Sequence, residues 1–251
     1  MGFWSAVLLP LMLCLMIFVG FFLRKDISPN TPGAVLWLQF AGLILAVMGS
    51  FLVPMLIIFI AYSVNNIEFK ADTWKTLFSL PISKFSVYSA KYFYAFFLIF
   101  LCLALFVLFT LGFGDFLGLI KPDLKFSEYS IASLLSQLYF KFFLASLGIL
   151  SIQFLLSLLF SDFLKPMGIG FIGTISGNIL AANDWKYAYL FPYSHPMMVL
   201  KAISQGKGGK HPTPVPEITI EMFTKDTWVS LAVALVVFIA GYFIVLKKSV
   251  K

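Results

Sequence analysis

Charged residues, histidines and cysteines are all scarce in this chain of 251 residues. Only 12% of the residues are charged, and the chain has two cysteines and two histidines. Soluble globular domains carry about 25% charged residues, so this composition excludes that class. Cys14 and Cys102 both lie inside long apolar runs, which indicates packing residues and not a disulfide framework or a metal site.

The sequence motifs of several catalytic sites are also missing. The chain has no GxxxxGK[ST] loop that could hold the phosphates of ATP, no HExxH pair and no GxSxG elbow. His195 and His211 each precede a proline in one long predicted loop, 183–227, where we expect solvated loop residues and not metal ligands. We therefore expect that this chain is not an enzyme and binds neither a metal nor a cofactor of its own.

Apolar residues make up most of what remains. Hydrophobic residues form 61% of the chain, and 30 of them are phenylalanine. A helical membrane span needs about 20 apolar residues. The sequence thus predicts an all-α membrane protein, a six-transmembrane-helix bundle that forms one domain over residues 1–251. The six predicted spans are residues 3–23, 35–62, 92–114, 142–160, 167–182 and 228–246.

The net charge of +7 does not indicate nucleic-acid binding. The basic residues are spread through the loops and form no dense stripe, whereas nucleic-acid binding surfaces concentrate them. Loop lysines of a membrane protein face anionic lipid, so the lipid bilayer is the expected partner of this charge.

A polar island of 28 residues, 63–90, separates the second and third apolar runs. On a helix, one face would carry Ile67, Ala71, Trp74 and Phe78, and the other Glu68, Asp72, Lys75 and Ser79. Pro81 would end that helix because proline has no N–H and clashes with the preceding turn. The pattern predicts a short amphipathic helix that lies along the membrane surface or docks a soluble partner.

The island also carries a recognisable motif, formed by Glu68, Thr73-Trp74-Lys75, Leu77, Leu80-Pro81-Ile82-Ser83-Lys84 and Lys91. It resembles the loop after the second span in permease subunits of type-2 ABC exporters, and most closely the lantibiotic-immunity and bacitracin-resistance group. In that family the loop holds a coupling helix that sits in a groove of a separate ATPase subunit. The resemblance implies an ATPase-coupling role for Glu68, Asp72, Trp74, Lys75, Phe78 and Pro81.

The resemblance has further implications for partners and location. ATP and Mg would bind to the partner ATPase, and two copies of this chain, or this chain and a similar permease, would form the path. The cargo would be an antimicrobial peptide, and the protein would lie in the plasma membrane. Family members usually carry a cytoplasmic amphipathic segment before the first span, so we expect residues 1–23 to belong to a truncated start or to a member without that element.

The orientation follows from the resemblance and not from charge. Lys and Arg are nearly balanced between the two sides of the predicted topology, so the positive-inside rule does not decide. The coupling resemblance places the loop 63–91 in the cytoplasm. We therefore predict that both termini are cytoplasmic and that the long loop 183–227 lies outside.

Two groups of polar or small residues within the spans allow alternative interpretations. Gly173 and Gly177 have the spacing that lets helices approach closely, and Asn178 and Gln153 could form hydrogen bonds between helices. Packing is the favoured interpretation, and lining of the substrate path is the alternative. The aromatic segment 185–204 is interrupted by prolines, and the resemblance implies short interfacial helices there.

Lys141 directly precedes the fourth predicted span. Residues 142–160 already provide about 28 Å of helix, so we expect Lys141 at the outer edge with its ammonium group reaching water. Alternatively, a helix that begins at Ile131 would place this charge near mid-membrane, where it would be a functional candidate.

Two other classes of function compete with the permease. An ion-driven secondary transporter would need ionisable residues at mid-membrane or broken helices in repeated positions, and the sequence shows neither. Composition leaves a non-transporting membrane scaffold open. Association with an ATPase would distinguish the permease from both.

Overall fold

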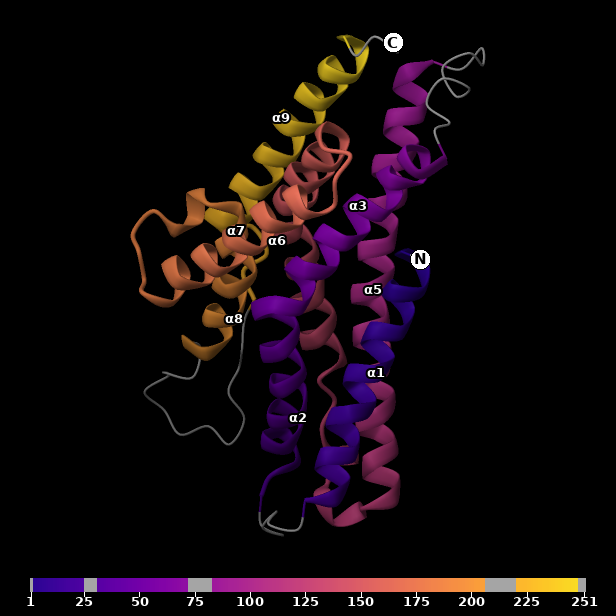
Figure 1. Ribbon diagram of the computed structural model, residues 1–251. Helices are drawn as coiled ribbons and strands as arrows, with labels where there is room; N and C mark the ends of the chain where they lie inside the picture. The colour runs from indigo at the N-terminus through magenta and orange to yellow at the C-terminus, as the bar shows by residue number, and fades with distance from the viewer. Residues whose placement is uncertain (1, 25–30, 72–82, 206–219, 248–251) are drawn as a thin grey trace.

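The computed structural model describes residues 2–24, 31–71, 83–205 and 220–247, and within these residues every regular element is helical. Figure 1 shows a long bundle with a smaller helical arm on one side. The bundle contains α1 (Gly2–Leu23), α2 (Gly33–Val47), η1 (Met48–Leu52), α3 (Val53–Ala71), α5 (Lys84–Ile120), α6 (Ala132–Leu159) and α9 (Lys225–Lys247). The arm contains α7 (Leu164–Ala182), η4 (Ala188–Leu190), η5 (Pro192–Ser194) and α8 (His195–Gln205).

Five of the described helices are long and apolar enough to cross a membrane. They cover Gly2–Leu23, Gly33–Asn66, Lys84–Ile120, Ala132–Leu159 and Lys225–Lys247. The predicted all-α membrane class is confirmed, but the predicted six spans are not. The predicted fifth span is a helix, α7, with 19 residues. It is not among the five because Lys165, Thr174, Ser176 and Asn178 make it too polar.

The second span is one continuous helix with a wider turn in its middle. The π-helical turn η1 joins α2 to α3, and the N–H of Val53 donates to the carbonyl of Met48. Pro54 follows directly and cannot donate to the carbonyl of Ser50, four residues earlier. A π turn at this point accommodates the proline without ending the helix.

The direction of each helix follows from its contacts. α1 runs parallel to α5, since Gly2 lies beside Leu98 and the ring of Phe18 packs against Phe113. α6 runs antiparallel to α5, with Tyr92 bonded to Ser151. α9 runs parallel to α6, because Ser230 bonds the Leu144 carbonyl, while Gly241 lies beside Leu155. The helix α5 is 37 residues long, about 55 Å, and connects the two ends of the bundle.

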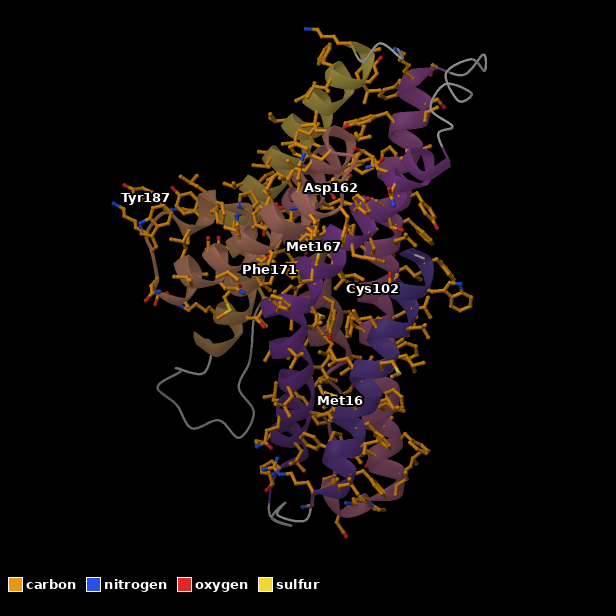
Figure 2. The ribbon with its side chains drawn as sticks, viewed as in Figure 1. Met16, Cys102, Asp162, Met167, Phe171 and Tyr187 are labelled. Atoms are coloured by element: carbon orange, nitrogen blue, oxygen red, sulfur yellow. The ribbon has the colours of Figure 1, made fainter. Side chains whose placement is uncertain are left out.

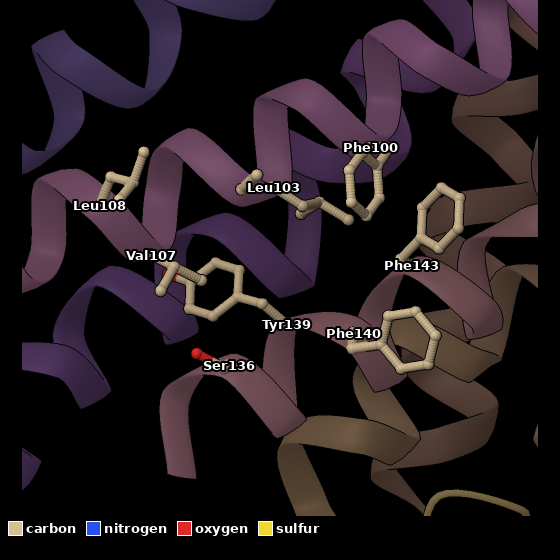
Figure 3. Close-up of a pocket in the computed structure, with 9 residues that line it drawn as sticks. Phe100, Leu103, Val107, Leu108, Ser136, Tyr139, Phe140 and Phe143 are labelled. Carbon is tan, nitrogen blue, oxygen red and sulfur yellow. The ribbon is translucent and has the colours of Figure 1, made fainter. Parts of the chain in front are cut away.

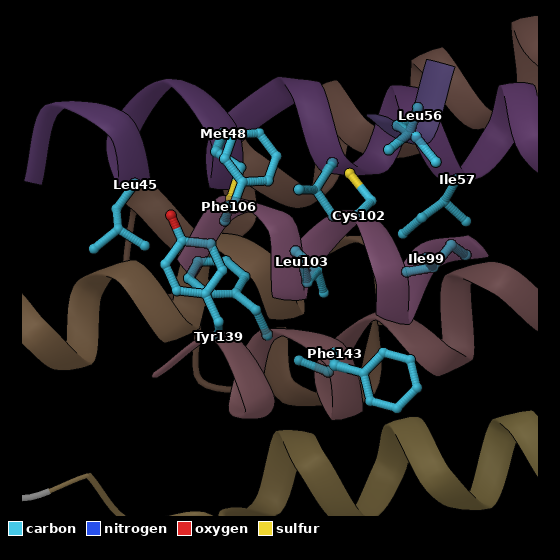
Figure 4. Close-up of a cluster of buried hydrophobic side chains, with 14 of the residues drawn as sticks. Leu45, Met48, Leu56, Ile57, Ile99, Cys102, Leu103, Phe106, Tyr139 and Phe143 are labelled. Atoms are coloured by element: carbon cyan, nitrogen blue, oxygen red, sulfur yellow. The ribbon is translucent and has the colours of Figure 1, made fainter. Parts of the chain in front are cut away.

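Large apolar side chains fill the centre of the bundle. Figure 4 shows Met48 from η1, Cys102 and Phe106 from α5, and Tyr139 from α6 in one cluster. In lipid, close packing and dispersion hold such a cluster together, because exposure to acyl chains costs an apolar side chain little. Cys14 and Cys102 are fully buried free thiols, which confirms their predicted packing role.

The close approach of α5 to α2 depends on a glycine. Gly114 of α5 lies under the indole of Trp37, where an added Cβ would overlap the ring. The indole Nε1–H donates to the Phe126 carbonyl at 2.8 Å, so this tryptophan is both packed and hydrogen-bonded. Phe126 belongs to η3 (Phe126–Glu128), which with η2 (Pro122–Leu124) connects α5 to α6.

After α7, the arm consists of short helices, as the resemblance implied for residues 185–204. The helices η4, η5 and α8 are too short to cross a membrane. Figure 2 shows Tyr187 at the outer tip of the arm, away from the bundle, and Asp162 near the junction between α6 and α7. Exposed Trp185 and Tyr187 suit a membrane interface, where aromatic rings with a polar group are favoured.

Candidate functional site

The segment predicted to couple to an ATPase lies mostly outside the described residues. Asp72, Trp74, Lys75, Phe78 and Pro81 all fall in 72–82. The backbone of Glu68 belongs to α3, but its side chain is outside the described part. The coupling role of these six residues therefore stays a prediction.

The described part of the polar island corrects one detail of that prediction. Residues 63–71 do not start a separate surface helix but continue α3 without a break. Within the bundle, Asn65 is anchored to α6 through its amide nitrogen. Its amide nitrogen donates to Ser157 Oγ at 2.7 Å, and Ser157 Oγ in turn donates to the Ala61 carbonyl. Polar residues at this position thus pack against α6 and do not mark a helix end.

The chain that follows the coupling segment is attached to the C-terminal end of α9. The hydroxyl of Ser83 accepts a hydrogen bond from the Ser86 N–H and caps α5. Lys84 Nζ donates to the Leu246 carbonyl at 3.3 Å, and Tyr88 OH donates to the Phe238 carbonyl at 2.8 Å. The start of α5 and the end of α9 therefore lie together at one end of the bundle, at the top of Figure 1.

A second group of residues joins α7 and the arm to α6. Gln153 is fully buried in α6, and its Nε2 donates to the hydroxyl of Tyr193 at 2.7 Å. Burial raises the pKa of Tyr193 to about 12, although the hydrogen bond with Gln153 opposes the shift. The hydroxyl therefore stays protonated near neutral pH and remains an acceptor for the amide.

The two predicted glycines lie against the same tyrosine. An added Cβ at Gly173 would be 3.1 Å from the ring of Tyr193, and one at Gly177 would clash with its backbone carbonyl. Gly170 allows the same helix to approach Gln153 and Ile58. The glycines thus let the backbone of η5, a short 3₁₀ helix, approach α7 closely. The sequence pattern had suggested contact with another spanning helix.

Asn178 bonds to the π-helical turn of the second span. Its Nδ2 donates to the Ser50 carbonyl at 2.5 Å. Pro54 cannot donate to this carbonyl, so the amide replaces a helical hydrogen bond that the proline removes.

The structure brings Gln153, Gly173, Gly177 and Asn178 into one seam along α7, which we call the α7 seam. These contacts are packing contacts, and a role in lining a path stays a prediction.

Sequence reasoning missed two residues that the α7 seam contacts, Tyr193 and Ser50. Tyr193 was part of an aromatic, proline-broken segment, and Ser50 had no distinguishing neighbour except Pro54 four residues later. The proline was the available signal, since it leaves one carbonyl without a helical donor.

Two predictions about charged or titratable residues were wrong. Lys141 is 4% exposed and lines a pocket with Asp226 of the first turn of α9 instead of extending along the surface, and α6 begins nine residues before it. His195 is fully buried and not a solvated loop residue. Its ring Nε2 bonds the Tyr189 carbonyl at 2.9 Å, and desolvation lowers its pKa, partly offset by that bond and by Asp226. His211 lies outside the described residues.

An apolar groove lies between α5 and α6. Figure 3 shows Phe100, Leu103 and Val107 of α5 facing Tyr139 and Phe143 of α6. The groove encloses about 370 Å³. Partly exposed Phe100 at its border shows that it opens to the surface of the bundle, where lipid chains would contact it.

Comparison with known proteins identifies a family. A family model described as ABC-2 family transporter protein matches residues 2–177, which is more than two thirds of the chain. The matched range runs from α1 into the α7 seam and includes the segment 72–82. Neither the curated proteins nor the solved structures contain a match to this chain.

Proposed function

The chain belongs to the ABC-2 transporter family and is a multi-pass membrane permease of an ABC transporter, and from this premise we propose that it exports its substrate with energy from a separate ATPase subunit. Family membership implies association with an ABC ATPase, and permeases of this family are normally the non-catalytic membrane subunits. The match over residues 2–177 is the observation that carries the proposal.

We place the coupling site in the segment between α3 and α5. Both helices are long and are bonded to the bundle. Asn65 of α3 donates to Ser157 of α6. Lys84 and Tyr88 of α5 donate to backbone carbonyls of α9. A force that the ATPase exerts on the segment 72–82 would therefore be passed to helices that are packed into the bundle. ATP and Mg would bind in the partner, and Trp74 and Phe78 would fill its hydrophobic cleft.

The substitution Trp74→Ala tests the coupling site. We expect the assembled complex to lose export, or to hydrolyse ATP without export, because an aromatic anchor in a docking groove carries much of the binding energy. Transport and ATPase activity would be measured on the same reconstituted preparation. Trp4→Ala is the matched control, since Trp4 is 64% exposed at the start of α1, far from the segment in sequence. Normal export by Trp74→Ala would contradict the coupling role.

We propose that two permease subunits form the path between them, as a homodimer or with a similar chain. The centre of one bundle is filled by large side chains, among them Phe40, Phe106, Phe142 and Phe154, each no more than 1% exposed. A substrate of any size would not fit through this packed centre. A path at the contact between two bundles does not require the centre to open.

We further propose that α7 provides a sixth crossing and that both termini are cytoplasmic. α6 and α9 run parallel and both have the length of a span, so the chain between them has to return. α7 runs antiparallel to α3, from the ring contact of Tyr62 with Phe163 to the bond of Asn178 with Ser50. The amide of Asn178 is then directed to a protein carbonyl and not to lipid.

Cysteine labelling from outside the cell tests this topology. In a background without Cys14 and Cys102, single cysteines would replace Asp162 and Tyr187, which are exposed at the two ends of α7. We expect a membrane-impermeant maleimide to label position 187 in intact cells and position 162 only after permeabilisation. Labelling of both positions in intact cells would show that α7 does not cross.

The cargo proposed from the resemblance is an antimicrobial peptide, which the protein would remove from the plasma membrane. The apolar, Phe-rich bundle surface would suit an amphipathic cargo. Cells with and without the permease and its ATPase would be compared for growth inhibition by such a peptide, and equal sensitivity would contradict this cargo.

A further inference from the structure

A pocket with buried charges of both signs lies between α6, the arm and the start of α9. It encloses about 270 Å³. Lys141 of α6 and Asp226 in the first turn of α9 line it, and they are 4% and 5% exposed. Charged side chains so deeply buried are rare unless a partner satisfies them.

Two of the residues that line the same pocket, Lys201 and Asp184, form an ion pair with each other. Lys201 Nζ contacts Asp184 Oδ1 at 2.7 Å and also donates to the Ala182 carbonyl. Trp185 and Thr224 also line the pocket. Because Lys201 and Asp184 satisfy each other there, the two inner charges are the groups left to bind something.

The inner charges do not pair with each other. Among the residues that the structure describes, Lys141 and Asp226 have no hydrogen bond and no ion pair within 4 Å, although both line one pocket. Lys141 can only donate hydrogen bonds, and a carboxylate can only accept them. A ligand that satisfies both has to carry an anionic acceptor and a cationic donor at separate places.

We propose that this pocket binds a zwitterionic head group with a phosphate and a primary ammonium, the phosphate on Lys141 and the ammonium on Asp226. A primary ammonium has N–H donors for the carboxylate, which a trimethylammonium lacks. The pocket volume lies just below the usual range of about 300–1,000 Å³ for small-ligand sites, which fits a head group and not a whole lipid or peptide. The exposed aromatic rings of Trp185 and Tyr187 place the pocket at the level of lipid head groups.

Thermal unfolding of the purified full-length chain in detergent tests the proposal. The added lipids would be phosphatidylethanolamine, phosphatidylcholine and phosphatidylglycerol with identical acyl chains. We expect phosphatidylethanolamine to raise the unfolding temperature at the lowest lipid concentration, because a ligand that binds only the folded state stabilises it. If the three lipids raised the unfolding temperature equally, this result alone would overturn the proposal, and no variant would need to be measured.

The variants Lys141→Gln and Asp226→Asn locate the effect. Each is expected to raise the half-saturating concentration of phosphatidylethanolamine about tenfold or more, the usual effect of losing a charge-assisted hydrogen bond. Lys186→Gln is the control, since Lys186 is an exposed lysine on the same arm outside the pocket. Unchanged half-saturation in both pocket variants would contradict the site.

Soluble phosphoethanolamine separates the two possible sources of the ligand. If it stabilises the protein and competes with the lipid, whereas phosphocholine does not, the pocket recognises the zwitterion itself and a free solute can supply it. If only the lipid acts, while both pocket variants weaken its effect, the ligand is a membrane lipid. If neither soluble compound nor lipid gives a head-group preference, the proposal is wrong.

Discussion

Tyr193 is the residue that ties the arm to the bundle. Its hydroxyl accepts from Gln153, its ring covers Gly173, and its backbone lies against Gly177. Contacts with side chain and backbone at once leave little freedom to adjust. The neighbouring glycines are therefore needed for space, and not for an unusual backbone conformation.

The substitution Gly177→Ala is expected to destabilise the protein by about 1–3 kcal/mol, as overpacking of a filled site does. The added Cβ would clash with the Tyr193 carbonyl, so backbone would have to move. Gly168→Ala on the same helix is the control, since nothing lies within 4 Å of its added Cβ. It is expected to be neutral or to stabilise by up to about 1 kcal/mol. Equal unfolding temperatures of the two variants would contradict this account of α7.

At single residues, the sequence alone was a good guide to apolar burial and a poor guide to buried polar groups. Cys14 and Cys102 are buried as expected. Lys141 and His195 were misplaced, because both lie near Asp226 of α9, which is remote in sequence and which no local pattern indicates. Burial of a charge depends on which distant element packs over it, and this is a property of the tertiary fold.

At the scale of elements, the π-helical turn and Asn178 form one unit. Pro54 removes a helical donor, η1 widens the helix, and the amide of α7 serves the Ser50 carbonyl. The unit joins the middle of the second span to α7. π turns are frequent at functional sites, which fits a permease that has to move.

A double-mutant cycle tests this unit. Asn178→Ala is expected to cost about 1 kcal/mol of stability, the usual net worth of a buried hydrogen bond. In a Pro54→Ala background the cost should fall, because the alanine introduced there has an N–H that can serve the Ser50 carbonyl. Unfolding would be followed for all four proteins in the same detergent. An identical cost of Asn178→Ala in both backgrounds would show that the amide does not replace the missing donor.

The helices could be predicted from the sequence better than their ends could. Each of the six predicted spans lies inside a helix or a continuous helical segment of the structure, with a difference of at most one residue at one end. The prediction succeeds because the length of an apolar run can be read from neighbouring residues alone. Two helices begin earlier than predicted: α5 begins after the capping residue Ser83, whose hydroxyl accepts from the Ser86 N–H, and α6 begins at Ala132. Whether α7 crosses could not be decided by apolarity, since Asn178 bonds to η1 and the glycines of α7 lie against η5.

At the scale of the whole molecule, the bundle has one end suited to coupling. The start of α5 is linked to α9 through Lys84 and Tyr88, and residues 72–82 directly precede this part of the chain in the sequence. The other end holds the connections η2 and η3 between α5 and α6. Long helices run from one to the other, so force applied at the proposed coupling end would reach the rest of the bundle.

The most direct test of the permease account is co-purification of the ATPase. The tagged chain would be extracted from native membranes in mild detergent, and its stoichiometric partners identified by mass spectrometry. The account predicts an ABC ATPase, retained with Trp4→Ala and lost with Trp74→Ala. Recovery of no ATPase, under conditions that keep known membrane complexes intact, would contradict the account and favour an ion-driven transporter or a membrane scaffold.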